Sequence, residues 1–219
     1  MTDIRDIKGA IFDMDGTILD SMPMWVNIEK DYLISMGLSP SPDTINALRS
    51  LNQAEAARYF RTEYGITQSY EEMAAGKSRI IEDFYFNRSE LKGSVLPVLD
   101  AFQSRGIKMC VATATDRYLT ERALLRCGIS GYFGRIFTCA EEETNKSAPE
   151  IFLRAAAFLG TDVGDTLVVE DALYAIRSAK SAGFPVAAIY DCAADKQQEA
   201  IKELCDFYLK SISDMLELL

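Results

Sequence analysis

Two pairs of acidic residues carry the strongest chemical signal in the sequence. Asp13 and Asp15 follow the apolar run at residues 9–12, and Glu170 and Asp171 end a second apolar run. Two carboxylates that lie this close together need either a cation between them or a shared proton. Mg²⁺ meets the first need, because it prefers hard oxygen ligands and tolerates retained waters. The two pairs therefore predict a magnesium site if the fold brings them together.

The segment Asp13-Met14-Asp15-Gly16-Thr17 predicts how the first pair is held. Asp13 ends the expected strand, so its carboxylate is fixed at the edge of a sheet, and Asp15 returns to the same side. Gly16 permits the sharp turn that follows. The alternative is a solvent-exposed acidic turn, which the position at the end of a buried strand disfavours.

A third cluster, at residues 113–116, could bind an anion. Thr113 and Ala114 end an expected strand at the point where a helix begins. Free backbone N–H groups and the helix dipole favour an anion at such a point, and Thr113 adds a hydroxyl donor. Asp116 is better explained as the N-cap of that helix. Because threonine is common at strand ends, this cluster supports a phosphate site only together with the others.

The fourth cluster is centred on Lys146. Ser147 and Glu150, which follow it, match a capping box and predict that a helix begins here. A lysine just before the positive end of a helix is unfavourable unless an anion is bound there. We therefore expect Lys146 to hold an anion. The alternative for Lys146 is an exposed surface lysine. For the second acidic pair, the alternative is that Asp171 simply caps the helix that follows it.

Composition excludes several classes of function. The chain has no histidine, which rules out a Ser-His-Asp triad, a Cys-His dyad and a histidine-rich zinc site. The net charge is −10, and no stretch collects enough Lys or Arg to bind a polyanion. We therefore expect neither nucleic acid nor a membrane surface as a partner. A divalent cation could still reverse the field locally for a phosphate ester.

The start of the chain and its cysteines predict a cytoplasmic protein. No apolar signal-like region follows Met1, and no stretch approaches transmembrane length. The five cysteines are scattered and form no CxxC pair. We interpret them as small buried side chains in a reducing compartment.

Helix and strand patterns alternate along most of the chain, which predicts an α/β fold with a doubly wound parallel sheet. We expect an α/β core at residues 1–20 and 92–219, with an all-helical insert at residues 21–91. The expected strands are 8–13, 107–113, 136–138, 166–170 and 185–190, and the expected helices of the core are 94–105, 117–127, one beginning at Ser147, one after residue 171, and 213–219. Ligands of such sheets bind at the carboxyl ends of the strands, where all four clusters fall.

Together these motifs resemble the haloacid dehalogenase-like hydrolase superfamily, in particular its small phosphatases and β-phosphoglucomutase-like proteins with a helical cap after the first strand. The segment at residues 13–17 is the most specific match, and Lys146 and the Val-Val-Glu-Asp run support it in the expected order. The resemblance covers nearly the whole chain. It implies a Mg²⁺-dependent phosphatase acting on a small phosphorylated metabolite, a sugar phosphate or a nucleotide.

The resemblance also implies a role for each site residue. Asp13 attacks the phosphoryl group and forms an aspartyl-phosphate, while Asp15 protonates the leaving oxygen and then activates water. Thr113, with Ala114 beside it, and Lys146 hold the phosphoryl oxygens.

The metal site follows from the same resemblance. Mg²⁺ bridges Asp13, the backbone carbonyl of Asp15 and Asp171, and Glu170 orients a metal-bound water. Dehalogenases of the superfamily lack the second aspartate, so Asp15 argues against carbon–halogen chemistry.

The sequence departs from the sugar-phosphate mutases of this group. These proteins have a histidine in the first cap helix, at the position of Trp25. Its loss favours water over a sugar hydroxyl as the final acceptor. Two alternatives stay open: a phosphosugar mutase and a non-catalytic phosphate-binding module.

Substrate recognition is expected in the helical insert. Trp25 and Met22 follow the nucleophile loop closely and are candidates for the mouth of the pocket, and Lys77 is a further candidate because the mutases carry a cap lysine. We expect the other aromatic residues and methionines of the insert to pack between its helices. We also expect a monomer or a weak dimer.

Overall fold

The computed structural model describes residues 4–48 and 51–219, and the chain separates into two compact units. The larger unit comprises Met1–Ser21 and Ser89–Leu219, and the smaller unit comprises Met22–Arg88. The regular secondary structure described in the smaller unit is helical, and the strands lie in the larger unit.

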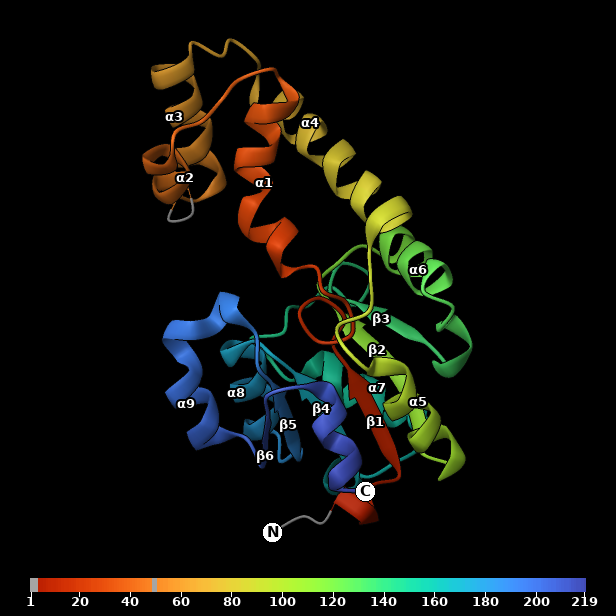
Figure 1. The fold of residues 1–219 in the computed structure, drawn as a ribbon. Coiled ribbons are helices and arrows are strands. Elements are labelled where there is room, and N and C mark those ends of the chain that lie inside the picture. Colours follow the sequence, from red (N-terminus) through yellow and green to blue (C-terminus); the bar gives the residue numbers. More distant parts are fainter. Residues whose placement is uncertain (1–3, 49–50) are drawn as a thin grey trace. The chain divides into compact units, whose positions relative to one another are not determined.

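The described part of the larger unit contains one parallel sheet of six strands. The strands are β1 (Gly9–Phe12), β2 (Lys108–Thr113), β3 (Ile136–Thr138), β4 (Thr166–Glu170), β5 (Val186–Ile189) and β6 (Phe207–Leu209). Their order is β3-β2-β1-β4-β5-β6 (Figure 1). β1 lies inside the sheet, where Phe12 pairs in register with Val111 of β2 and Val169 of β4. This arrangement confirms the predicted parallel sheet, whose inner strands are apolar because both faces are covered.

Helices cover both faces of this sheet. They are α5 (Val95–Ser104), α6 (Arg117–Arg126), α7 (Glu150–Leu159), α8 (Leu173–Ser181) and α9 (Gln198–Leu204). α7, α8 and α9 bury apolar side chains in one cluster with sheet residues such as Ile11 and Val168. On the other face Phe12 packs against Phe102 of α5, with the ring centroids 5.8 Å apart. Burial of this kind stabilises the fold by about 25 cal/mol for each Å² of apolar surface removed from water.

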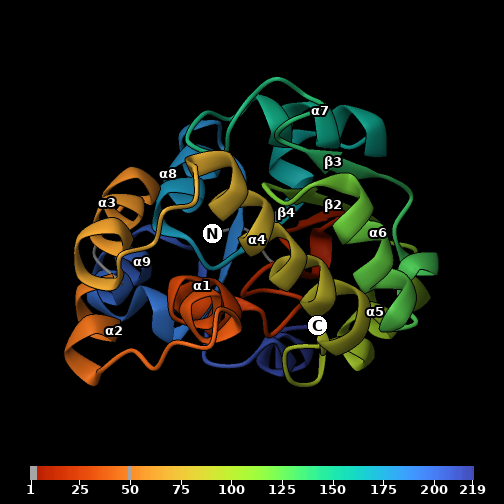
Figure 2. The ribbon, with the colours of Figure 1, turned by 90° about the horizontal axis from the view of Figure 1, so that it is seen from above.

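The smaller unit has its own core. Its helices are α1 (Met22–Ser35), α2 (Pro42–Leu48), α3 (Gln53–Tyr64) and α4 (Tyr70–Asp83), followed by a π-helical turn at Phe84–Arg88. Within this unit α1 lies between α2 and α4 (Figures 1 and 2). Tyr32 and Phe60 meet in the core with their ring centroids 5.8 Å apart. Asn52 and Glu55 form a capping box that fixes the start of α3.

The end of the chain differs from the prediction. Where a helix was expected over residues 213–219, the chain forms a 3₁₀ segment at Ile212–Glu217, and it is preceded by α9 and the edge strand β6, which were not predicted. Ser211 and Asp214 form a capping box at the start of the 3₁₀ segment. β6 was not predicted from the sequence, although β3, which is equally short, was.

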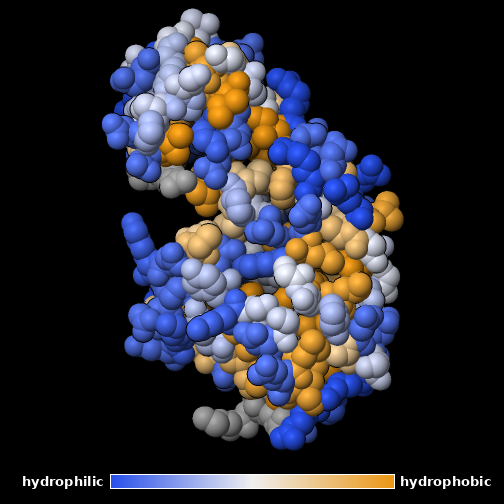
Figure 3. All heavy atoms as spheres, viewed as in Figure 1, coloured by the Kyte–Doolittle hydropathy of each residue, from blue (hydrophilic) through white to orange (hydrophobic). Residues whose placement is uncertain are grey.

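The face drawn in Figure 3 is hydrophilic over α9 and more hydrophobic over α5. In α9, Ile201 is buried against the sheet, and Glu199 and Lys202 face solvent. α9 is therefore an ordinary edge helix with one apolar side. Among the residues that the structure describes, no helix combines the length and the apolar character that crossing a membrane requires.

The cysteines behave differently from the prediction. All five are free. Cys110 is buried as expected, but Cys192 is exposed, and the other cysteines are partly exposed. The expectation of uniformly buried cysteines was therefore wrong, because only Cys110 lies in the middle of a sheet strand.

Candidate active site

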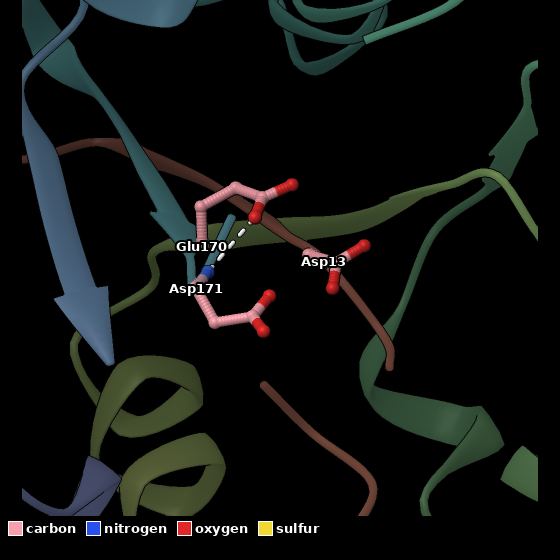
Figure 4. Close-up of side chains that lie close together, drawn as sticks. All are labelled: Asp13, Glu170 and Asp171. Atoms are coloured by element: carbon pink, nitrogen blue, oxygen red, sulfur yellow. Dashed lines mark hydrogen bonds between the residues drawn. The ribbon is translucent and has the colours of Figure 1, made fainter. Parts of the chain in front are cut away.

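The carboxyl ends of β1 and β4 bring three acidic side chains together (Figure 4). Asp13 follows β1, Glu170 ends β4, and Asp171 comes next. One carboxylate oxygen of each residue lies within 4.8 Å of the others, and all three residues are buried. Asp171 does not cap α8, because the N-cap residue is Ala172 and no side chain caps that helix. The sheet therefore places Asp13 next to the second acidic pair.

Lys146 lies inside the same cluster. Its buried ammonium group donates to Oδ1 of Asp13 and, at 2.7 Å, to Oε1 of Glu170. Oε2 of Glu170 accepts from the backbone N–H groups of Asp171 and Ala172 at 2.8 and 2.9 Å. Both carboxylate oxygens of Glu170 are therefore engaged with groups of the protein.

Lys146 reaches the cluster from a loop and not from the start of a helix. The prediction that Ser147 and Glu150 form a capping box was wrong. α7 begins at Glu150, its N-cap residue is Pro149, and no side chain caps it. The Ser147 N–H donates to Oδ1 of Asn145 at 2.9 Å, so an Asx turn replaces the expected cap.

The cluster carries more negative than positive charge. Three carboxylates face one ammonium group, so the fully ionised cluster has two uncompensated negative charges. Burial raises the pKa of Asp13 to about 7 against the opposing charge of Lys146. Burial and the charge of Glu170 raise the pKa of Asp171 to about 9. A divalent cation can take the place of these protons, and carboxylate oxygens are ligands that hard cations prefer. The donor set therefore fits a bound divalent cation.

Lys146 is a fixed positive charge at neutral pH. Burial alone would lower its pKa, but the carboxylates of Asp13 and Glu170 raise the pKa above the ordinary lysine value. A permanent ammonium group beside Asp13 favours the ionised form of that carboxyl group. It is also a suitable donor for an oxygen of a phosphoryl group.

Asp15 is held by two hydroxyl groups that the sequence did not identify as site residues. Ser21 Oγ donates to Oδ1 of Asp15 at 2.6 Å, and Thr115 Oγ1 donates to Oδ2 at 2.7 Å. Gly16 has a φ of 82°, the left-handed conformation that lets the chain turn sharply after Asp15. Thr115 lies in the predicted anion cluster, and its position there was the one available signal. Nothing in the sequence singles out Ser21.

The anion cluster after β2 is arranged around Thr113. Its hydroxyl is buried and accepts from the Thr115 N–H at 3.1 Å. Ala114 is exposed. Asp116 occupies the N-cap position of α6, but its side chain makes no capping hydrogen bond. The position of Asp116 therefore agrees with the prediction, whereas its capping role does not.

The candidate recognition residues lie in the smaller unit. Trp25 and Lys77 line a cavity of about 150 Å³ within this unit, and Met22, at the start of α1, does not line it. Trp25 donates to the Tyr85 hydroxyl at 3.1 Å. Lys77 pairs with Oε1 of Glu29 at 2.8 Å, and Oε2 of Glu29 is buried with no hydrogen-bond partner among the described residues. Lys77 is therefore a neutralised cation.

Comparison with known proteins identifies a family and relatives that are named as phosphatases. The family of haloacid dehalogenase-like hydrolases matches residues 10–189, in agreement with the resemblance seen in the motifs. Hexitol phosphatase B of Escherichia coli (strain K12) is 26% identical over 220 residues, covering 98% of this chain and 97% of that protein. Fructose-1-phosphate phosphatase YqaB of the same strain is 31% identical over 191 residues, covering 80% of this chain and 92% of that protein.

Solved structures share the fold. A Thermotoga maritima protein described as a candidate β-phosphoglucomutase has a TM-score of 0.79 and 21% identity, covering 97% of this chain and 100% of that chain. CbbY from Rhodobacter sphaeroides in complex with phosphate has a TM-score of 0.72 and 18% identity, covering 95% of this chain and 96% of that chain. At these identities the likeness concerns the architecture, and it confirms the predicted α/β fold.

Proposed function

The chain belongs to the haloacid dehalogenase-like hydrolase family, and we propose that it is a Mg²⁺-dependent phosphatase of a small phosphorylated metabolite with Asp13 as the nucleophile. The observation that carries this proposal is the buried ion pair of Asp13 with Lys146 at the end of β1. A carboxylate repels a phosphate ester unless positive charge lies beside it. Lys146 supplies such charge at the nucleophile itself.

Asp13 acts in two displacements. One of its carboxylate oxygens attacks the phosphorus atom, the bond from phosphorus to the ester oxygen breaks, and an aspartyl-phosphate forms. Water then attacks the phosphorus atom, the bond to Asp13 breaks, and inorganic phosphate leaves. The second displacement returns Asp13 to its starting state.

Asp15 carries the proton in both displacements. It gives a proton to the leaving ester oxygen in the first and takes one from the attacking water in the second. The hydrogen bonds from Ser21 and Thr115 fix both oxygens of Asp15. This fixed orientation supports a role in which the proton must arrive at one particular atom.

Three groups hold the phosphoryl oxygens in this proposal. They are the Thr113 hydroxyl, the backbone N–H of Ala114 and the ammonium group of Lys146. Thr113 and Ala114 end β2 just before α6, and backbone N–H groups at the start of a helix favour an anion.

Mg²⁺ would be held by the carboxylates of Asp13 and Asp171 and by the backbone carbonyl of Asp15. Glu170 is the third carboxylate of the same cluster. The two uncompensated negative charges of the buried cluster support this assignment. When bound, the ion would cancel charge that otherwise keeps a phosphate ester away from the nucleophile. Glu170 keeps the site in order through its hydrogen bonds to Lys146 and to two backbone N–H groups.

Sugar phosphates are the substrate class that we favour, with nucleotides as the second class. By their names, the two relatives described above are a hexitol phosphatase and a fructose-1-phosphate phosphatase. The chain contains no histidine, which favours water as the final acceptor and thus a phosphatase over a phosphosugar mutase.

Release of phosphate from p-nitrophenyl phosphate tests the proposal. We expect release to require Mg²⁺, to stop on chelation with EDTA and to fall by about 10³-fold or more in Asp13→Asn. Asp116→Asn, which changes an exposed aspartate without a capping bond, is the control and should keep wild-type turnover. Wild-type turnover in Asp13→Asn would remove Asp13 from its role. Formation of glucose 6-phosphate from β-glucose 1-phosphate faster than phosphate release would instead identify a mutase.

A further inference from the structure

The ammonium group of Lys92 lies where three segments of the larger unit meet. It donates to the carbonyl oxygens of Gly16 and Tyr190 and to Oδ2 of Asp191. Gly16 follows Asp15 directly, and Tyr190 and Asp191 follow β5. We propose that Lys92 is a positioning residue for the phosphatase reaction proposed above, because it fixes the loop that carries Asp15.

The environment of Lys92 is that of a fixed structural cation. The three acceptors use all the donors of an ammonium group. The Lys92 side chain is 19% exposed and that of Asp191 is 5% exposed. The ion pair, at 2.6 Å, is therefore largely shielded from solvent. A cation with every donor engaged has one preferred position, and it imposes that position on the groups around it.

Lys92 also contacts the loop after β1 through its backbone. The Lys92 N–H donates to the Ile18 carbonyl at 2.8 Å, and the Gly16 N–H donates to the Leu19 carbonyl at 3.0 Å. Leu19 forms an antiparallel bridge with Leu91. The turn after Asp15 is thus closed by the hydrogen bond between Gly16 and Leu19. Residues 91 and 92, which are distant in the sequence, pair with the same turn.

The side chain of Lys92 restrains the Gly16 peptide group on its carbonyl side, which no backbone hydrogen bond in the described part of the chain reaches. Gly16 has the left-handed φ of 82°, and a glycine has no side chain to restrict rotation of its peptide group. The charged hydrogen bond to the Gly16 carbonyl holds that peptide group in one orientation. Asp15 is the adjacent residue, and displacement of a catalytic group by about 1 Å can cost about 100-fold in rate.

A purely structural role would work through Asp191 instead. Asp191 organises the segment after β5 by itself, because its Oδ1 accepts from the Ala193 N–H at 2.8 Å and its carbonyl accepts from Nε2 of Gln198 at 3.1 Å. If the ion pair with Asp191 were the whole function of Lys92, loss of either partner would have the same consequence. If the bond to Gly16 matters, loss of Lys92 must impair the reaction more.

The experiment compares Lys92→Met with Asp191→Asn by kcat and KM on p-nitrophenyl phosphate and by Tm. Both variants lose the ion pair, so both should have a lower Tm. We expect Lys92→Met to lower kcat by about tenfold or more with KM within about twofold, and Asp191→Asn to lower kcat by less than about threefold. Lys92→Arg keeps the charge and should restore part of kcat. Lys180→Met is the control. It removes a lysine that pairs with Asp206, at a distance of 2.7 Å, and neither residue belongs to the segments held by Lys92.

The outcomes separate this inference from the proposed function. Equal losses of kcat in Lys92→Met and Asp191→Asn, or wild-type kcat in a Lys92→Met protein of lower Tm, would overturn the positioning role. Lys92→Gln, which is uncharged but still a donor, replaces Lys92→Met in the same comparison if the latter does not fold. A wild-type protein without phosphatase activity would instead defeat the proposed function.

Discussion

The Thr115 hydroxyl donates to Oδ2 of Asp15 at 2.7 Å, although 100 residues separate the two in the sequence. This hydrogen bond joins the loop after β1 to the loop after β2, which is the neighbouring strand. Ser21 holds the other oxygen of Asp15 at 2.6 Å. Asp15 therefore has a set orientation that two separate segments define.

Thr115→Val should lower kcat by about tenfold while KM changes little. The substitution keeps the shape of the side chain and removes the hydroxyl donor, so Oδ2 of Asp15 loses the hydrogen bond from Thr115. Steady-state kinetics on p-nitrophenyl phosphate with saturating Mg²⁺ measures this. Thr120→Val is the matched control, because Thr120 is also buried and its hydroxyl donates to the carbonyl of Asp116, the N-cap residue of α6. The same kcat in the two variants would show that the bond to Asp15 does not matter.

Lys146→Met should destabilise the metal-free protein strongly. The variant leaves buried carboxylates without their counter-charge, and breaking a buried ion pair by removing one partner costs about 3–5 kcal/mol. In a chain of this size each kcal/mol corresponds to about 2–4 °C in Tm. Thermal unfolding in EDTA checks this. The control is Lys8→Met, which removes an exposed lysine paired with Asp165 and should leave Tm nearly unchanged. Similar changes in Tm for both variants would refute the buried charge cluster.

Asp171→Asn should raise the Tm of the metal-free protein, and more so at higher pH. Burial and the charge of Glu170 raise the pKa of Asp171 to about 9 in the folded state, whereas an unfolded aspartate has a pKa of about 3.9. Between these values the folded protein binds more protons than the unfolded chain, so the free energy of unfolding falls as pH rises. The asparagine variant lacks this loss. Its Tm advantage over wild type in EDTA should therefore grow between about pH 6 and pH 9.

Added Mg²⁺ should reverse that order. The wild-type protein gains Tm on binding the ion, and Asp171→Asn gains much less because it lacks one of the proposed ligands. Asp116→Asn serves again as the control and should follow the wild-type curve. A Tm difference that is constant with pH would speak against mutual repulsion of the carboxylates, and an equal gain with Mg²⁺ would remove Asp171 from the proposed ligands.

The convergence of Asp13 with Glu170 and Asp171 could be anticipated from the sequence for a simple reason. The strands before them are continuous apolar runs, and the carboxyl ends of parallel neighbours meet at one edge of the sheet. Such an argument uses strand positions alone and needs no side-chain conformations.

The contacts of Ser21, Thr115 and Lys92 could not be anticipated in this way. Each depends on where a side chain points after distant segments have folded, and no local pattern records that. Local competition misled the prediction at Lys146, where the Asn145 side chain takes the backbone N–H of Ser147 and displaces the expected cap. β6 was missed although β3, also of three residues, was predicted. An apolar run this short does not by itself distinguish a strand from a helical segment.

The cavity of the smaller unit carries the last prediction, which concerns substrate preference. Lys77 is neutralised by Glu29, and the described residues that line this cavity include no other cation for a second phosphate group. Oε2 of Glu29 is buried and lacks a hydrogen-bond partner among the described residues, and the indole of Trp25 lines the same cavity. A buried acceptor beside the Trp25 side chain suits a ligand with hydroxyl groups. A hydrogen bond from such a hydroxyl would stabilise the buried oxygen, which lacks a donor.

Glu29→Gln should therefore shift preference among substrates without abolishing the reaction. We expect kcat/KM for hexitol phosphates and fructose 1-phosphate to fall by about tenfold relative to p-nitrophenyl phosphate, which offers no such hydroxyl groups. Glu63→Gln is the control, because Glu63 is exposed on α3 and does not line the cavity. If the ratio of the two kcat/KM values stays at the wild-type level, Glu29 does not read hydroxyl groups. The same ratio in Trp25→Ala would then remove this cavity from substrate recognition, and with it the roles proposed for Trp25 and Lys77.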